Sequence, residues 1–305
     1  NSSLNTYINS FLEVLIKISK YSSSHPNVIR ASIGVVALNR FGYHNFPKLT
    51  QIIDRLLPQT DIEYVRFTSW CVGRLIHHPE IEQGLYAAHL FTRCVGWCRA
   101  NGRRARPLAA AHLLGSLSSN AGSSVVVYFP TLQSIIWILV SHESTQVLRA
   151  TADAIYFFTR AVVRYGRSDL ESYLNFFTKL CSKLLNFNAS LRNYAALMLF
   201  EQLINSCPDY FLPNMFRYYS LFDELDPDCP MLVKQAQFVA IASLSQVDPR
   251  IFTENYAEDL FSLVDSILFE FPKEIVDSLA LLCRTIPDFM ITKLPELKEY
   301  AKELV

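Results

Sequence analysis

The densest group of side chains that could do chemistry is a run of arginines around one turn. Its members are Arg93, Arg99, Arg103, Arg104 and Arg106. The dipeptide Asn101-Gly102 lies in the middle of the run, and Asn-Gly marks turns, so we expect a turn between two helices. Guanidinium groups bind carboxylates and phosphates through paired hydrogen bonds. We therefore predict that Arg99, Arg103 and Arg104 help to dock an acidic surface; the alternative is a solvated turn with arginines at a helix end.

Two cysteines and a histidine could ligate a metal ion. Cys94 and Cys98 lie four residues apart, on one face if the segment is helical, and His89 is nearby. Zinc sites usually combine more closely spaced cysteines with a second matching pair, and the sequence has neither. We interpret these residues as core packing and expect no metal and no cofactor. The seven cysteines are an odd number scattered among apolar residues, which favours buried thiols in a reducing compartment.

Other polar groups are interpreted as ends of elements. His77-His78 precedes Pro79 at a predicted helix end, where imidazoles can hydrogen-bond to terminal carbonyl groups. The acidic residues 223–228 could attract a cation, but they lack the glycine and the closing glutamate of a calcium loop. We interpret this segment as an exposed turn between two helices.

No catalytic or phosphate-binding motif stands out in the sequence. Glycine-rich phosphate loops, the hydrolase G-x-S-x-G and the zinc-protease H-E-x-x-H are missing. Spacing does not test for triads, which assemble in space. We nevertheless expect no catalysis, because open helical arrays seldom enclose the dry pocket that such chemistry requires.

The elements that must position these residues repeat along the chain. A basic residue recurs at intervals of 36 to 43 residues near the start of Ala- and Leu-rich stretches. These anchors are Arg30, Arg66, Arg106, Arg149, Arg192 and Lys234. Apolar residues within the stretches recur at helical spacing. Two helices per unit of about 40 residues describe a HEAT-type repeat, and we interpret the anchors as a structural ladder that bonds neighbouring repeats.

Prolines give a second, longer period. Pro47, Pro130, Pro213 and Pro295 follow one another at 83, 83 and 82 residues, each in an apolar-Pro-x-apolar pattern. Proline suits the first turn of a helix, where its missing N–H would be unbonded anyway. We therefore predict that each proline begins the first helix of an alternate repeat.

The predicted fold is all-α: a HEAT-type α-solenoid of about seven helix pairs plus a trailing helix. The predicted repeats span residues 1–42, 43–83, 84–124, 125–166, 167–209, 210–251 and 252–290, with a partial repeat over 291–305. The last helix lacks its partner and the chain does not begin with Met. We therefore expect this chain to be cut from a longer array.

Composition and charge further limit the classes of protein to which the chain can belong. Half of the residues are apolar and 18% are charged, which excludes a disordered chain. The net charge is zero, but residues 1–170 carry +8 and residues 171–305 carry −8, and this polarity concerns partners rather than fold. The most membrane-like stretch, residues 125–140, is interrupted by Pro130, Gln133 and Ser134. It is shorter than the about 20 residues of a spanning helix, so we predict no transmembrane segment.

Several motifs together resemble one known family. They are Leu56-Leu57-Pro58, Val72-Gly73-Arg74-Leu75, Arg93-Cys94-Val95-Gly96-Trp97 and Gly102-Arg103-Arg104. The paired stretches 129–140 and 147–161 fit the repeat that follows. This region is similar to the N-terminal HEAT array of the target-of-rapamycin (TOR) kinases, which belong to the phosphatidylinositol-3-kinase-related kinases. The resemblance is clearest over residues 30–165; beyond them only the repeat architecture carries it.

The resemblance implies a non-catalytic scaffold in a complex that controls growth in response to nutrients. In that family the helical arm docks a subunit called raptor, and a serine/threonine kinase domain lies far downstream. The implied partners are a raptor-like subunit, the rest of the parent kinase chain and a second copy. The implied location is cytoplasmic, peripheral at lysosomal or vacuolar membranes.

The alternatives are other helical arrays. They are a HEAT scaffold of another giant kinase, a nuclear-transport receptor or phosphatase scaffold, and a nucleic-acid-binding solenoid. Neutral overall charge disfavours a transport receptor, and the acidic second half argues against a long nucleic-acid track.

Overall fold

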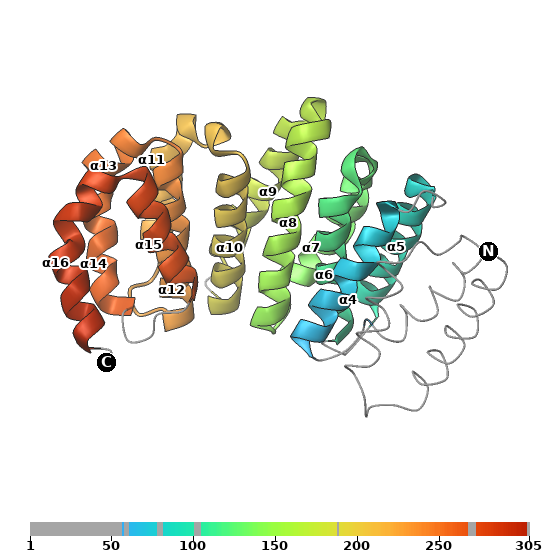
Figure 1. Ribbon diagram of the computed structural model, residues 1–305, viewed down its shortest axis with the longest axis horizontal. Helices are drawn as coiled ribbons and strands as arrows, with labels where there is room; N and C mark the ends of the chain where they lie inside the picture. Colours follow the sequence, from blue (N-terminus) through green and yellow to red (C-terminus); the bar gives the residue numbers. More distant parts are fainter. Residues whose placement is uncertain are drawn as a thin grey trace, which may run out of the picture. The chain divides into compact units, whose positions relative to one another are not determined.

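The computed structural model describes Leu57 and residues 61–77, 82–100, 105–187, 189–267 and 273–303. These residues form helices and connecting turns, with no strand among them, so the all-α prediction is confirmed (Figure 1). The chain divides into two compact units between Ser168 and Asp169. We call them unit 1 and unit 2. The predicted positions Arg30, Pro47, Arg103 and Arg104 lie outside the described residues.

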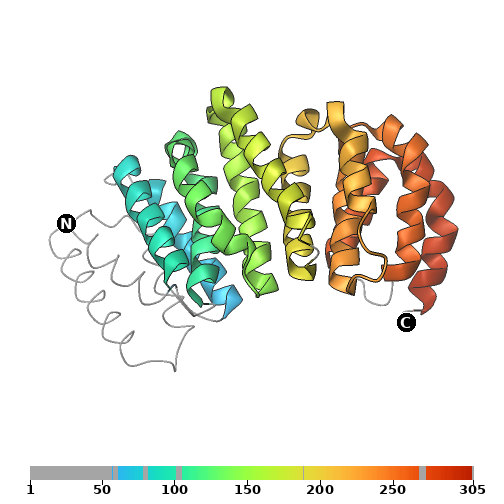
Figure 2. The ribbon, with the colours of Figure 1, turned by 180° about the vertical axis from the view of Figure 1, so that it is seen from behind.

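Unit 1 consists of helix pairs in two layers. Its described elements are α4 (Ile62–Arg74), η2 (Leu75–His77), α5 (Gln83–Arg99), α6 (Ala105–Asn120), η3 (Gly122–Tyr128), α7 (Phe129–Val140) and α8 (Thr145–Tyr165), and η4 (Arg167–Asp169) spans the division. The second helices of successive pairs, α4, α6 and α8, pack side by side, and α5 packs against α7 (Figure 1). Figure 2 shows the layer of first helices from the opposite side.

Polar caps fix where the helices of unit 1 begin. The Asp61 carboxylate accepts a hydrogen bond from the Tyr64 amide at 3.1 Å, at the start of α4. The Glu82 carboxylate accepts from the amides of Gly84 and Leu85, at the start of α5. Such caps satisfy amide groups that have no partner within the helix.

Small residues bring the second helices of unit 1 close together. A Cβ atom added to Gly73 of α4 would lie 2.9 Å from the backbone carbonyl carbon of Ser116 in α6. A Cβ atom added to Gly115 would lie 3.4 Å from the Cα atom of Ala154 in α8. Backbones can approach this closely only where side chains are small, so these contacts set the register of α4, α6 and α8.

Unit 2 continues the helix pairs with more interruptions. Its elements are α9 (Leu170–Leu185), α10 (Ser190–Ser206), η5 (Pro208–Tyr210), η6 (Leu212–Asn214), α11 (Met215–Asp223), α12 (Met231–Ser243), η7 (Leu244–Gln246), α13 (Pro249–Asn255), α14 (Ala257–Ile267), α15 (Lys273–Thr285) and α16 (Pro287–Glu303). Phe200 is fully buried, with its ring 5.0 Å from Phe222 and 5.5 Å from Tyr218. Aromatic side chains thus form much of this core.

The helices follow the predicted order of pairs. The pairs α7–α8 and α9–α10 fall within the predicted repeats 125–166 and 167–209. The anchors Arg66, Arg106, Arg149, Arg192 and Lys234 all lie in the first half of a second helix. Toward the end of the chain the helices begin earlier than the predicted repeats: α13 begins at 249 rather than 252, and α16 begins at 287 rather than 291.

Three of the four prolines that were predicted to begin helices lie within the described residues, and each has a different outcome. Pro130 lies in the first turn of α7, as predicted. Pro213 lies in the 3-10 helix η6, which leads directly into α11. Pro295 does not begin a helix: it lies inside α16, which already begins at Pro287. The prediction was wrong because Pro287 takes the first-turn position, and the exposed Pro295 removes only one backbone hydrogen bond from a continuing helix.

Candidate functional site

The structure describes only part of the predicted arginine cluster, because Arg103 and Arg104 lie outside the described residues. Arg99 is exposed and is the last residue of α5. Arg93 and Arg106, from α5 and the start of α6, line a common pocket of about 590 Å³. The docking role of Arg99, Arg103 and Arg104 stays a prediction.

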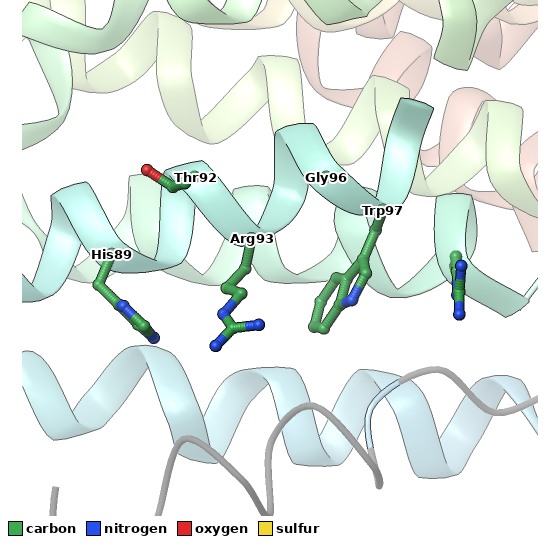
Figure 3. A pocket seen from close by; sticks show the side chains of 6 residues that line it. His89, Thr92, Arg93, Gly96 and Trp97 are labelled. Carbon is green, nitrogen blue, oxygen red and sulfur yellow. The ribbon is translucent and has the colours of Figure 1, made fainter. Parts of the chain in front are cut away.

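The pocket beside α5 combines cationic and aromatic side chains. Its lining residues are His89, Thr92, Arg93, Gly96, Trp97 and Arg106. His89, Arg93 and Trp97 project from the same side of α5, whereas Thr92 projects from another side (Figure 3). Two guanidinium groups and an imidazole would attract an anion. The sequence predicted the arginines but not that Arg93 and Arg106 line the same pocket.

The seven cysteines were expected to be buried; Cys71, Cys94, Cys98 and Cys181 are buried, whereas Cys207 and Cys229 are half-buried and Cys283 is exposed. Burial raises the pKa of the Cys94 thiol well above its usual value and that of Cys98 to about 12. Both side chains pack in the interior, with the Cys94 sulfur 3.8 Å from the carbonyl oxygen of Ala110 in α6. The core-packing interpretation is confirmed, and His89 lines the pocket instead. Among the described residues, no three His, Cys, Asp or Glu side chains are arranged to hold a metal ion.

The structure agrees with the turn expected at residues 223–228 but not with the helix cap expected at His77. The acidic segment 223–228 ends α11 and forms a turn, in which the Asp228 amide donates to the Asp226 carboxylate at 2.9 Å. His77 ends η2, but its Nε2 atom pairs with the side-chain oxygen of Asn120 in α6 at 3.3 Å. This contact joins two repeats rather than capping a helix; His78 and Pro79 lie outside the described residues.

The ladder interpretation of the anchors stays a prediction, and the structure gives a local contact for Arg192. Its guanidinium carbon lies 4.4 Å from the ring centroid of Phe187, within the same predicted repeat. Arg66, in contrast, influences His112 of the next helix pair. Equivalent positions in the repeat therefore make different contacts.

A surface that the sequence did not reveal lies on the second helices of unit 1. We call it the arginine–aromatic face, formed by Trp70 and Arg74 of α4 and by Tyr156, Phe157, Arg160 and Arg164 of α8. Trp70 is 41% and Phe157 38% exposed. Between the two helices, α6 presents short side chains such as Ser116 and Asn120.

Helical spacing places two arginines of the face, Arg74 and Arg160, over an aromatic ring. The guanidinium carbon of Arg74 lies 4.9 Å from the Trp70 ring centroid, and that of Arg160 lies 5.6 Å from Tyr156. Arg160 also donates a hydrogen bond to the Tyr156 hydroxyl at 3.0 Å. Residues four apart are neighbours on a helix surface, and cation–π contacts orient the guanidinium plane. The sequence signal was therefore present: Trp and Tyr four residues before Arg.

Contacts between α4 and α6 show that their exposed residues lie on one side. His77 pairs with Asn120, and the Ser116 hydroxyl donates to the Trp70 carbonyl at 3.5 Å. Farther along the same helices, Arg66 and burial together lower the pKa of His112 to about 4. His112 is therefore neutral at pH 7, and the positive charge on this side comes from arginine.

The positive charge near the face comes from arginine and not from lysine. Residues 61–168 contain eleven arginines and no lysine. Arg66, Arg74, Arg160 and Arg164 form no ion pair with a carboxylate in the described part of the chain. Apart from the N–H group that Arg160 donates to the Tyr156 hydroxyl, their outer N–H groups can bind an anionic partner, which arginine does through two parallel hydrogen bonds.

One apolar stretch in unit 1 has the length and composition of a membrane span. It comprises η3 and α7, over Gly122–Val140, and one third of it is buried inside the structure. Leu132, Ile135 and Leu139 are buried, and Trp137 and Ile138 are exposed. A core helix meets the same criteria, so the predicted lack of a transmembrane segment stays a prediction.

Comparisons with known proteins add no assignment. A scan against models of protein families finds no match to this chain, and a search among curated proteins finds none either.

Proposed function

We propose that this chain is a protein-binding scaffold without catalytic activity, and that it docks protein partners in a TOR-type kinase complex. The observation that carries the scaffold role is the arginine–aromatic face. It is broad and solvent-exposed, and it spans three consecutive second helices. Interface energy concentrates at arginine and aromatic anchors. The link to TOR and a raptor-like subunit comes from the sequence resemblance alone.

The state of the buried nucleophiles supports a non-catalytic role. Burial raises the pKa of the Cys94 and Cys181 thiols far above neutrality. An activated cysteine has a lowered pKa and partial exposure, the opposite of what these residues have.

The test is reconstitution with a candidate subunit. We expect the chain to co-elute in gel filtration with the raptor-like subunit of its own organism, and cross-links to fall on α4 or α8. We expect no ATP turnover above buffer. Failure to co-elute would remove the TOR assignment. Reproducible turnover that follows the chain through several columns would remove the scaffold role.

The alternatives give different results in parallel assays. A nucleic-acid-binding solenoid would shift DNA or RNA in gels with a steep dependence on salt. A transport or phosphatase scaffold would instead retain a transport cargo or a phosphatase subunit on the immobilised chain. Either result without co-elution of the raptor-like subunit would replace the TOR assignment.

A further inference from the structure

We propose that the arginine–aromatic face binds an extended acidic segment of a partner protein. Carboxylates of the segment pair with Arg74 and Arg160, and an apolar side chain between them packs on Trp70 or Phe157. The inference rests on the proposed scaffold role but not on the TOR assignment.

The first step is the continuity of the surface. Gly73 lies against Ser116, and Gly115 against Ala154, so α4, α6 and α8 follow one another without large side chains between their backbones. The layer of first helices covers the other side of α6 and α8, through α5 and α7. The exposed residues of the second helices therefore share the side that remains open.

The second step is that aromatic rings hold the two arginines in place before a ligand binds. Arg74 is held over Trp70 and Arg160 over Tyr156, and the described residues supply neither with a carboxylate partner. The rings restrict both flexible side chains, and the N–H groups other than the one that Arg160 donates to the Tyr156 hydroxyl stay available for a ligand. Less entropy is then lost on binding than with a free lysine.

The third step is the choice between carboxylate and nucleic acid. The face shares its helices with two exposed acidic residues, Glu63 of α4 and Asp153 of α8. A nucleic-acid strand carries a phosphate at each nucleotide and would meet these carboxylates, whereas a peptide can place its charges selectively. Trp70 and Phe157 also offer exposed apolar area between the arginines. These features favour a peptide with few, spaced carboxylates.

The fourth step is the length of the segment. Packed helices lie about 8–10 Å apart, so α4 and α8, with α6 between them, are separated by about 16–20 Å. An extended chain rises about 3.3 Å per residue. Two carboxylates about five or six residues apart therefore reach Arg74 and Arg160 at the same time.

The experiment measures fluorescence anisotropy of a labelled ten-residue peptide. Its probe carries two Glu residues six positions apart with Leu midway between them, and the matched peptide has Gln for both Glu. We expect the Gln peptide to bind at least tenfold more weakly. We expect the double variant Arg74→Glu/Arg160→Glu to lose at least tenfold in affinity for the probe. The control Arg250→Glu, an exposed arginine of α13 in unit 2, should leave binding unchanged.

A conservative variant separates paired hydrogen bonding from simple charge. Arg74→Lys/Arg160→Lys keeps the charge but loses the planar guanidinium, so we expect a loss of three- to tenfold. Unchanged melting temperatures would show that all variants fold. Equal binding of the Glu and Gln peptides, or full binding by the charge-reversed variant, would overturn the proposal.

Other occupants give recognisable results. Tighter binding of a ten-nucleotide single strand than of the acidic peptide would assign the face to nucleic acid and overturn the proposal. A concentration-dependent oligomer that dissociates in the charge-reversed variant, without peptide binding, would assign it to a second copy. Co-elution of a raptor-like subunit with the charge-reversed variant, without any peptide binding by the native chain, would reject this inference alone.

Discussion

Units 1 and 2 build similar helix pairs with different side chains at the contacts between helices. In unit 1, the second helices meet through small residues, with Gly73 against Ser116 and Gly115 against Ala154. In unit 2, large rings join one helix pair to the next: Phe200 of α10 packs on Phe222 of α11, and Tyr219 of α11 stacks on Tyr256, just before α14, with ring centroids 4.1 Å apart. The small-residue contacts thus hold the layer of second helices together in unit 1, whereas the aromatic contacts hold successive pairs together in unit 2.

Residues 61–168 of unit 1 and the residues of unit 2 differ in the type as well as the sign of charge. Residues 61–168 hold eleven arginines, no lysine and six acidic residues. Residues 169–305 hold seven lysines, four arginines and twenty acidic residues. The Lys293 ammonium of unit 2 pairs with Glu258 at 2.8 Å. Exposed positions are not constrained by the repeat, so partner recognition can differ between the units while the fold is kept.

The largest expected effect tests the aromatic core of unit 2. Phe200→Ala should cost about 3–5 kcal/mol in the free energy of unfolding, because it opens a cavity among fully buried rings. The control Phe216→Ala removes a ring that is 71% exposed and should cost less than about 1 kcal/mol. Urea unfolding followed by circular dichroism measures both.

Tryptophan fluorescence makes this prediction specific to one unit. All three tryptophans, Trp70, Trp97 and Trp137, lie in unit 1. We expect Phe200→Ala to lower the urea midpoint seen by circular dichroism more than the midpoint seen by fluorescence. Identical shifts by both probes would show that the two units unfold as one and that the comparison does not extend to stability.

The next effect is a pH dependence in unit 1 that comes from one buried histidine, His112 of α6. Burial and then Arg66 lower the pKa of His112 from 6.5 to about 4. Between these values the unfolded chain binds a proton that the folded chain does not, so stability falls as the pH falls from 6.5 to 4. The full loss is about 3 kcal/mol, at about 1.4 kcal/mol per pKa unit.

Tryptophan fluorescence during urea unfolding at pH 7, 6 and 5 measures this loss in unit 1. His112→Gln should flatten the dependence, because glutamine does not titrate. A variant that keeps the full slope would show that another group is responsible.

A matched pair of glycine substitutions tests the close approach of the second helices. Gly73→Ala places a Cβ atom against Ser116 and should cost about 1–3 kcal/mol, because α4 and α6 must separate. Gly96→Ala meets nothing within 4 Å and should stabilise α5 by about 0.5–1 kcal/mol. Thermal unfolding measures both. A stabilising Gly73→Ala would show that small residues do not set the spacing in unit 1.

The helix pairs could be predicted from the sequence, but the candidate site could not. The recurrence of Arg106, Arg149 and Arg192 follows the geometry of the repeat, which is local and periodic. The arginine–aromatic face depends on how neighbouring helices are aligned, and that alignment is set by contacts such as Gly73 with Ser116. Single-sequence periodicity shows which residues share one helix face, but not which faces of different helices coincide.

At Pro295 the periodic spacing of prolines is present in the sequence, but the helix start predicted from it is wrong. Its spacing of 82 residues from Pro213 fits the longer period, yet it lies inside α16. Helix starts respond to the first available proline and to burial farther on. Pro287 comes earlier, and Met290 in the next turn is buried, which extends the helix across the later position.

The smallest expected effect follows from this difference between prolines in the two units. Pro295→Ala restores an N–H donor inside α16 and removes the clash of the proline ring with the carbonyl of Ile291. Because Ile291 is 62% exposed, water near this turn compensates part of that loss, so we expect a gain of only about 1 kcal/mol rather than the full about 3 kcal/mol.

The control is Pro130→Ala, in the first turn of α7. It should change stability by less than about 0.5 kcal/mol, because no intrahelical bond depends on that nitrogen. Circular dichroism should register the first change and tryptophan fluorescence should register neither. A destabilising Pro295→Ala would contradict the expected gain from restoring an N–H donor inside α16.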